Sequence, residues 1–147
     1  MKIQPLFTAG YSGCDPDTFL DKLRRHDVEI LVDVRQRPIS RKRGFSKSVL
    51  QEFIESNGIS YLHQQEFGVP SDLRQQLRDG GSLGAYFGSF RQYLKTQQEA
   101  LLSLYELAKK KRCCLMCLEA EPGECHRSVV AESVLAQNGK LLEVRHI

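Results

Sequence analysis

The sequence predicts an α/β protein of three-layer αβα type, with a mostly parallel, Rossmann-like sheet of about five strands. Two observations lead to this class. Short apolar segments alternate along the chain with segments whose apolar residues recur every three or four positions, as strands alternate with helices in such folds. Polar residues gather at one end of each apolar segment, as they do where a parallel sheet carries a site. We expect one domain, residues 1–147.

The first predicted unit is a strand and a helix. Residues 3–9 are largely apolar and end at a glycine-rich turn, so we expect a strand there. Asp15 is a suitable N-cap and Pro16 suits the first helical position. The spacing of Phe19 and the leucines that follow then predicts a helix to about Arg25.

The next elements repeat this order. Residues 29–34 form a nearly continuous apolar run, which is typical of a strand buried on both faces. After a basic loop, Ser46 is expected to cap a helix that ends at Asn57-Gly58. Residues 59–62 predict a short third strand. Residues 64–83 are rich in polar residues and glycine, and we expect an irregular excursion over the site.

The second half begins with a long helical pattern over residues 85–111, with a possible break near residues 96–97. The basic run at residues 109–112 suits the C-terminal dipole of this helix better than contact with nucleic acid. Residues 113–118 predict a fourth strand. A final helix opens at Cys125 or Ser128, and residues 141–146 predict the last strand.

Composition indicates an ordinary globular protein, with 27% charged residues and a net charge of +3. No apolar run approaches the roughly 20 residues that span a bilayer, and the first residues lack the apolar stretch of a signal peptide. We therefore expect a cytoplasmic protein without membrane contact. The five cysteines are not spaced as a secreted disulfide framework, so we expect reduced thiols.

Positive charge is concentrated after the second predicted strand. No acid occurs between Asp33 and Glu52, whereas thirteen positions there hold six cations, from Arg35 to Lys47. This field can attract an anion, although a solvated loop at the domain edge explains it equally well.

Parallel strands bring their carboxyl ends to one edge of the sheet, where α/β proteins place their sites. The polar groups that we expect to meet there are residues 10–12, residues 33–35, His63, residues 117–119 and His146.

A dense group of reactive side chains lies at the start of the last predicted helix. Backbone N–H groups and the helix dipole favour an anion at Cys125 and His126, and Arg127 adds a bidentate donor. The same field would favour a Cys125 thiolate. Alternatively, Arg127 pairs with Glu121 or Glu124 and only fixes the loop.

Carboxylates at strand ends are candidate bases. Cys117 and Glu119 share a strand face, so Glu119 can act as a general base or hydroxyl acceptor, while Cys117 is expected to be a core residue. Asp33 ends a buried strand and needs a partner, which Arg35 or a substrate can supply.

Tyr11 and Ser12 lie in a glycine-flanked turn that allows a ligand to approach the backbone, although a simple turn is almost as good an explanation.

Zinc would accept the available cysteine and histidine ligands, but the chain has no tight Cys-x-x-Cys pair here, so no metal and no cofactor are expected. A phosphatase-type loop needs an arginine six positions after its cysteine, and position 123 is glycine. The segment Leu31 to Arg35 is similar to a strand of rhodanese domains, but only locally.

Taken together, these segments resemble the family catalogued as domain of unknown function 488. The matching pieces are Thr8 to Ser12, Leu31 to Arg35, Pro38-Ile39-Ser40-Arg41, Tyr61, Phe67-Gly68, Cys117 to Glu119, Cys125 to Arg127, and His146-Ile147. The resemblance implies a compact three-layer α/β domain whose polar strand ends form a shared site. It places Ser12, Ser40 and Arg41 among the ligand-binding candidates and implies no particular reaction.

Our leading hypothesis is an enzyme that acts on a phosphate-bearing ligand, such as a nucleotide or nucleic-acid component, by hydrolysis or glycosyl transfer. The expected anion ligands are Arg35, Arg41 and Arg127. The expected groups for proton transfer or hydroxyl binding are Glu119, Asp33, Tyr11 and His126. A non-catalytic nucleic-acid-binding module and a redox or transfer enzyme that uses Cys125 are the alternatives. The sequence leaves the oligomeric state open.

Overall fold

The computed structural model describes residues 3–118, 126–137 and 141–147. One sheet holds all five described strands, every pair of neighbours is parallel, and the strand order is β3-β2-β4-β1-β5. The strands are β1 (Gln4–Gly10), β2 (Ile30–Asp33), β3 (Ser60–His63), β4 (Cys113–Cys117) and β5 (Leu142–His146). The helices are α1 (Pro16–Arg25), α2 (Lys47–Ser56), α3 (Ser71–Arg78), α4 (Leu83–Leu94), α5 (Gln98–Lys110) and α6 (Arg127–Leu135), with a short 3₁₀ helix, η1 (Gln65–Phe67).

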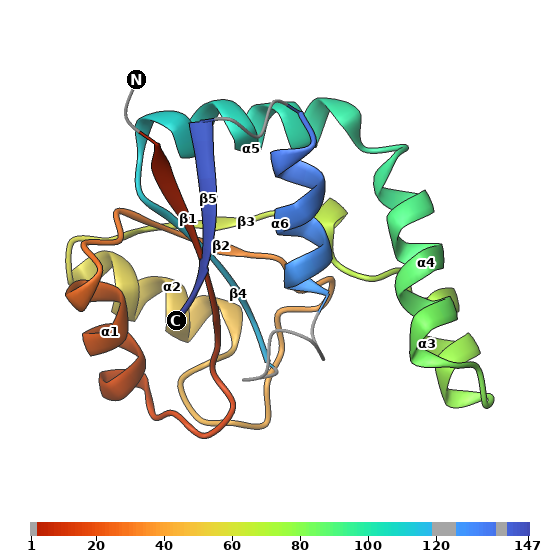
Figure 1. The fold of residues 1–147 in the computed structure, drawn as a ribbon. Helices are drawn as coiled ribbons and strands as arrows, with labels where there is room; N and C mark the ends of the chain where they lie inside the picture. The colour runs from red at the N-terminus through yellow and green to blue at the C-terminus, as the bar shows by residue number, and fades with distance from the viewer. Residues whose placement is uncertain (1–2, 119–125, 138–140) are drawn as a thin grey trace.

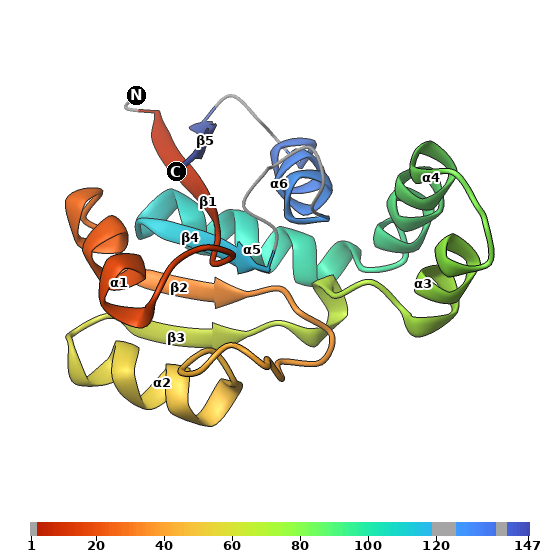
Figure 2. The ribbon, with the colours of Figure 1, turned by 90° about the horizontal axis from the view of Figure 1, so that it is seen from below.

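Helices cover both faces of this sheet, so the predicted three-layer αβα class is confirmed (Figures 1 and 2). Helices α1 and α2 pack on one face, and α5 and α6 pack on the other. The central strand β4 supplies both cores, because alternate residues point to opposite faces: Leu115 belongs to the α5–α6 core and Met116 to the α1–α2 core. Helices α3 and α4 form a hairpin beside these layers (Figure 2).

The register of the strands determines which side chains meet at the carboxyl edge. Gly10 at the end of β1 pairs with Cys117 at the end of β4, and Asp33 at the end of β2 pairs with Met116. Asp33 also pairs with His63 on its other side. The residues that follow β1, β2 and β4 therefore emerge side by side, as the sequence predicted.

The predicted strands and most predicted helices agree with the structure within a few residues. Helix α1 begins with the expected cap, since the Asp15 carboxylate accepts a hydrogen bond from the backbone N–H of Thr18 at 2.7 Å. The anticipated break in the long helical pattern is also present, between α4 and α5.

The prediction of an irregular segment at residues 64–83 is wrong, because this stretch contains η1 and all of α3. Helix α3 has no fully buried residue, so it lacks the broad apolar stripe by which a core-facing helix is found in a sequence. Its residue types, mainly Leu, Arg and Gln, favour a helix through their intrinsic propensity alone.

The basic run at residues 109–112 lies at the C-terminal end of α5, with Lys109 and Lys110 in its last turn. Lys109 pairs with Glu106, and Lys111 pairs with Glu29. Within the described parts of the chain, no helix has the length and apolar character that crossing a membrane requires.

Candidate functional site

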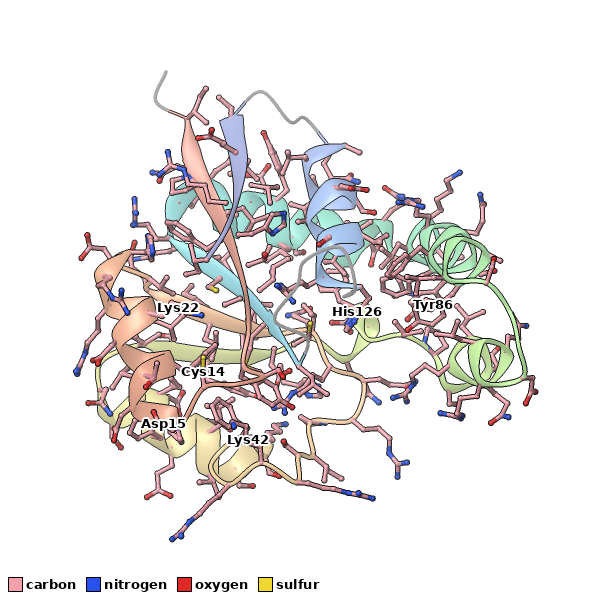
Figure 3. The ribbon with its side chains drawn as sticks, turned by 60° about the horizontal axis from the view of Figure 1, so that its bottom comes forward. Cys14, Asp15, Lys22, Lys42, Tyr86 and His126 are labelled. Carbon is pink, nitrogen blue, oxygen red and sulfur yellow. The ribbon has the colours of Figure 1, made fainter. Side chains whose placement is uncertain are left out.

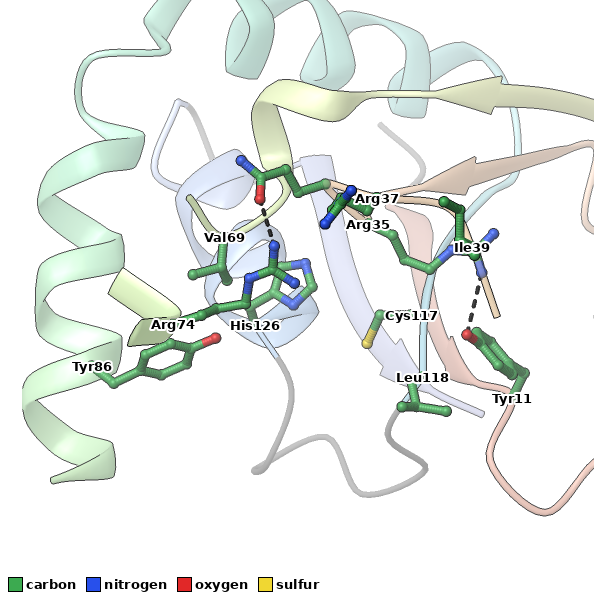
Figure 4. A pocket seen from close by; sticks show the side chains of 11 residues that line it. Tyr11, Arg35, Arg37, Ile39, Val69, Arg74, Tyr86, Cys117, Leu118 and His126 are labelled. Atoms are coloured by element: carbon green, nitrogen blue, oxygen red, sulfur yellow. Dashed lines mark hydrogen bonds between the residues drawn. The ribbon is translucent and has the colours of Figure 1, made fainter. Parts of the chain in front are cut away.

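A cavity of about 210 Å³ opens at the carboxyl edge of the sheet, where the segments after β1, β2 and β4 meet α3, α4 and the start of α6 (Figure 4). We call this cavity the edge pocket. It is lined by Tyr11, Arg35, Gln36, Arg37, Ile39, Val69, Arg74, Tyr86, Cys117, Leu118 and His126. Three of these side chains are cationic, and no described lining residue is a carboxylate. The electrostatic character of the edge pocket is therefore positive.

Two of the three arginines keep their charge available. Arg37 is exposed, and neither it nor Arg74 forms an ion pair with any described residue. Arg74 donates one hydrogen bond from Nη2 to the Gln36 side-chain oxygen at 2.6 Å, while its buried Nε–H has no acceptor in the described structure. A buried donor without an acceptor is costly, so an anion that accepts from Nε would be stabilised.

The third arginine, Arg35, is held in place by a buried network. It donates from Nε and Nη2 to the two carboxylate oxygens of Asp33, at 2.8 and 2.7 Å. Its Nη1 donates to the Phe45 carbonyl at 2.7 Å and to the Tyr11 hydroxyl at 3.2 Å. Asp33 is 0% exposed and also accepts from the Arg35 backbone N–H and the Tyr61 hydroxyl. Asp33 is thus saturated by four donors and serves as an anchor for Arg35.

The protonation states of this network follow from its contacts. Burial alone would lower the pKa of Arg35, but the hydrogen bonds and charge of Asp33 outweigh burial and raise it. Burial and the hydrogen bond to Asp33 raise the pKa of Tyr61. The network therefore keeps a charged guanidinium and a neutral phenol at any physiological pH.

The Tyr11 hydroxyl lies at one side of the edge pocket, opposite Tyr86 and Arg74 (Figure 4). Its ring stacks on Phe45, with centroids 4.5 Å apart and planes 7° from parallel. Because the hydroxyl oxygen accepts from Arg35, its own proton can be donated to a ligand.

His126 contributes an imidazole from the N-cap position of α6, and Figure 3 shows it facing the α3–α4 hairpin. Its Nε2 lies 2.7 Å from the Val34 carbonyl, which can only accept, so Nε2 carries the proton. Burial is the main reason that the pKa of His126 falls to about 4; the bond to Val34 opposes the shift, and the charges of Arg127 and Arg74 add to it. The ring is neutral at pH 7, and Nδ1 is its acceptor atom.

The wall between α3 and the segment after β2 is tightly packed. A Cβ atom at Gly68 would lie 2.2 Å from the backbone nitrogen of Gln36, so only glycine fits there. This close approach fixes Gln36, which in turn accepts from Arg74. The glycine at position 68 thus affects the position of Arg74 in the edge pocket.

Residues 15–134 match the family described as Domain of unknown function DUF488. The chain belongs to this family. The match covers most of the chain and includes the segments that supply Arg35, Arg74 and His126 to the edge pocket. No curated protein and no solved structure gives a significant match.

Three candidates from the sequence line the edge pocket of this DUF488 protein: Tyr11, Arg35 and His126. Five others lie outside its lining: Ser12, Asp33, Ser40, Arg41 and Arg127. Ser12 is exposed in the turn after β1, and its backbone N–H donates to the Leu118 carbonyl at 2.8 Å.

The loop candidates Ser40 and Arg41 also lie outside the pocket lining. The Ser40 hydroxyl accepts from the Lys42 backbone N–H at 3.0 Å, which gives it a structural role in the loop. Arg41 is exposed. Arg127 is 0% exposed, and its Nη1 donates to the Cys117 sulfur at 3.4 Å, so it is buried behind the pocket wall.

Two further candidates, Glu119 and Cys125, lie outside the described residues.

The state of the cysteines differs from the prediction in part. Cys117 is disulfide-bonded, so the expectation of reduced thiols is wrong for this residue, while Cys14, Cys113 and Cys114 are free. Among the described residues of this DUF488 protein, no cluster of three or more histidines, cysteines or carboxylates could hold a metal ion.

The structure adds pocket residues that the sequence did not single out. Arg74 and Tyr86 come from α3 and α4, the hairpin beside the sheet, and Gln36 follows β2. An exposed helix carries no core pattern that would place Arg74 near the strand ends. A signal was available in Gln36 and Arg37, which directly follow Arg35 at the end of a predicted strand.

Proposed function

We propose that this protein is an enzyme that acts on a phosphate-bearing ligand, such as a nucleotide or a nucleic-acid component. The observation that carries the proposal is the composition of the edge pocket, which has three arginines and no described carboxylate in its lining. Asp33 already compensates Arg35, but a neutral or cationic ligand would leave the charges of Arg37 and Arg74 uncompensated, whereas a phosphoryl group can accept from several guanidinium N–H donors at once.

The arginines have different tasks in this proposal. Arg35 is fixed by Asp33, which balances its charge, and provides a rigid guanidinium wall. Arg74 offers its buried Nε–H, and Arg37 brings an exposed guanidinium at the mouth. Since Arg74 and Arg37 carry no ion pair among the described residues, a ligand anion does not have to displace a carboxylate.

The size of the edge pocket limits what it can enclose. Pockets that enclose drug-sized ligands measure roughly 300–1,000 Å³. A volume of about 210 Å³ suits a phosphoryl group with the sugar that carries it, so the rest of a nucleotide would extend beyond the mouth.

Proton transfer is available from the residues around this cavity. His126 is neutral and has Nδ1 as an acceptor, and Tyr11 has a proton to donate. A bound phosphate would raise the pKa of His126 by its negative charge, which makes the imidazole a better base in the complex than in the free protein. These roles fit hydrolysis or glycosyl transfer.

Binding is tested by calorimetric titration with nucleoside monophosphates and with ribose 5-phosphate. Arg74→Gln removes one of the two unpaired charges of the edge pocket, and we expect it to weaken binding by about 10- to 100-fold, since a charge-assisted hydrogen bond contributes about 1.5–3 kcal/mol. Arg78→Gln is the matched control, because Arg78 is exposed on the same helix and lies outside the pocket lining. Equal losses in both variants, or no binding by the wild type, would overturn the proposal.

Catalysis is tested on the ligands that bind, by measuring release of phosphate and of free base. His126→Gln and Tyr11→Phe are expected to lower kcat while the ligand still binds. If every bound ligand remains unchanged in the presence of wild-type protein, the enzymatic part of the proposal is abandoned and binding alone is retained.

A further inference from the structure

The basic loop, residues 35–47, connects β2 to α2 and begins inside the edge pocket. Four of its cations lie beyond the pocket lining or at its mouth and have no ion pair among the described residues. These are Arg37, Arg41, Arg43 and Lys47. Lys42 faces Asp15 (Figure 3), whose pKa is lowered first by hydrogen bonds from Thr18 and further by the charge of Lys42. The loop is therefore a positive surface, and Asp15 lies near its Lys42.

This basic loop has a defined backbone rather than an open one. The Ser46 hydroxyl accepts from the Ser40 backbone N–H at 2.9 Å and donates to the Ser40 carbonyl. The Lys47 N–H donates to the Pro38 carbonyl at 2.8 Å, and the buried Phe45 side chain fixes the loop to the core. The cations are thus presented on a fixed backbone, which reduces the ordering cost of binding a polyanion.

The basic loop and the edge pocket are continuous. Arg37 and Ile39 belong to both, and both are exposed at the mouth. Arg41 follows two residues later, so its Cα lies at most about 7 Å from that of Ile39. A ligand that leaves the pocket on this side meets positive charge at once.

The neighbouring apolar surface suits an extended ligand as well. Ile39 is 74% exposed at the pocket mouth, where a sugar or base of a ligand too large for the cavity would pack. The aromatic ring of the loop, Phe45, is buried and cannot stack on bases. Recognition along the loop would therefore act on the phosphate backbone and carry little sequence preference.

From this continuity we infer that the natural ligand is a single-stranded nucleic acid whose terminal phosphate enters the edge pocket and whose following phosphates lie along the basic loop. The inference rests on the proposed function and specifies its substrate class. A single strand is favoured because a cavity of about 210 Å³ admits one phosphate and its sugar, whereas a paired end would have to open first.

The test compares ligands that differ in one feature each, with fluorescence anisotropy as the measurement. The set contains a mononucleotide, a 5′-phosphorylated hexamer, the same hexamer with a 3′-phosphate or no terminal phosphate, and a blunt duplex, as both DNA and RNA. We expect a terminally phosphorylated hexamer to bind at least tenfold more tightly than the mononucleotide, the unphosphorylated hexamer and the duplex.

Two double variants separate the loop from general electrostatics. Arg41→Gln with Arg43→Gln removes two loop charges. Arg25→Gln with Lys110→Gln is the matched control, because these exposed residues end α1 and α5 at the opposite edge of the sheet. The loop variant should reduce the slope of log affinity against log salt by about 1.4, at about 0.7 per phosphate contact, and leave mononucleotide binding unchanged. The control variant should change neither quantity.

The outcomes distinguish this inference from the proposed function. If mononucleotides bind through Arg74 but the hexamer binds no more tightly, the inference is wrong and the proposed function survives. If nothing binds, both are wrong. Hexamer binding that is insensitive to the terminal phosphate and to Arg74→Gln overturns the inference, and it overturns the proposed function as well if mononucleotide binding is also insensitive to Arg74→Gln.

Discussion

Replacing Asp33 by asparagine should destabilise the protein strongly, because it removes the charge that anchors Arg35. Asp33 is 0% exposed and Arg35 is buried, and two hydrogen bonds of 2.7–2.8 Å join their side chains. Removing one partner of a buried ion pair typically costs about 3–5 kcal/mol. With an unfolding entropy of about 2.1 cal/mol/K per residue, this corresponds to a drop in Tm of roughly 10–16 °C for a chain of this length.

The assay is thermal unfolding followed by circular dichroism at pH 7, with urea unfolding as a second measurement. Glu52→Gln is the matched control, because Glu52 is exposed and the same chemical change there should alter stability by less than about 0.5 kcal/mol. A drop in Tm of less than about 3 °C for Asp33→Asn would refute the anchoring role. A native Tm combined with lost turnover would instead favour the role of Asp33 as a base.

Three further predictions concern titration, packing and thiols. His126 has a pKa of about 4 in the folded protein, so below pH 6.5 the folded state binds fewer protons than the unfolded state. The free energy of unfolding should therefore fall by up to about 3 kcal/mol between pH 6.5 and pH 4. A His126→Gln variant with the same pH dependence would contradict this. Gly68→Ala should lower the free energy of unfolding by about 1–3 kcal/mol and weaken anion binding, because the new Cβ would overlap the backbone of Gln36. Gly88→Ala, whose Cβ would meet open space in α4, should raise the free energy of unfolding by about 0.5–1 kcal/mol. Equal stabilities of the two variants in urea unfolding would contradict this packing. Burial raises the pKa of Cys113 to about 12, so a thiol reagent at pH 8 should label the partly exposed Cys14 first. Equal labelling rates of Cys14 and Cys113 without denaturant would contradict the burial of Cys113 in the core.

The sequence predicted the sheet and its carboxyl edge because these depend on short-range signals. Apolar runs such as residues 113–117 identify buried strands, and the Asp15-Pro16 cap identifies the start of α1. Parallel connections then bring the strand ends together, so Tyr11 and Arg35 could be placed at one site before the fold was known.

The remaining parts of the site depend on tertiary contacts that leave little trace in the sequence. Arg74 reaches the edge pocket because the α3–α4 hairpin packs beside the sheet, and α3 itself lacks a buried face. Arg127 has the residue type and helix position of an anion ligand, yet its side chain is buried toward Cys117. A helix-start arginine can point either way, and the choice is made by packing.

The two roles considered for Asp33 illustrate the same limit. A carboxylate that ends a buried strand must be paired or used, and the sequence allows both. The structure supplies the partners, because Tyr61 on β3 and Arg35 together occupy its two oxygens. The pairing of β2 with β3 brings Tyr61 there, and no local pattern encodes that contact.

The most direct test of the central claim is an experimental structure with a nucleoside monophosphate bound. We expect the phosphoryl group inside the edge pocket, within about 3 Å of Arg74 Nε and in contact with Arg35 or Arg37, with the base outside the mouth. A phosphoryl group bound elsewhere while the edge pocket holds only solvent would contradict the proposed role of this pocket.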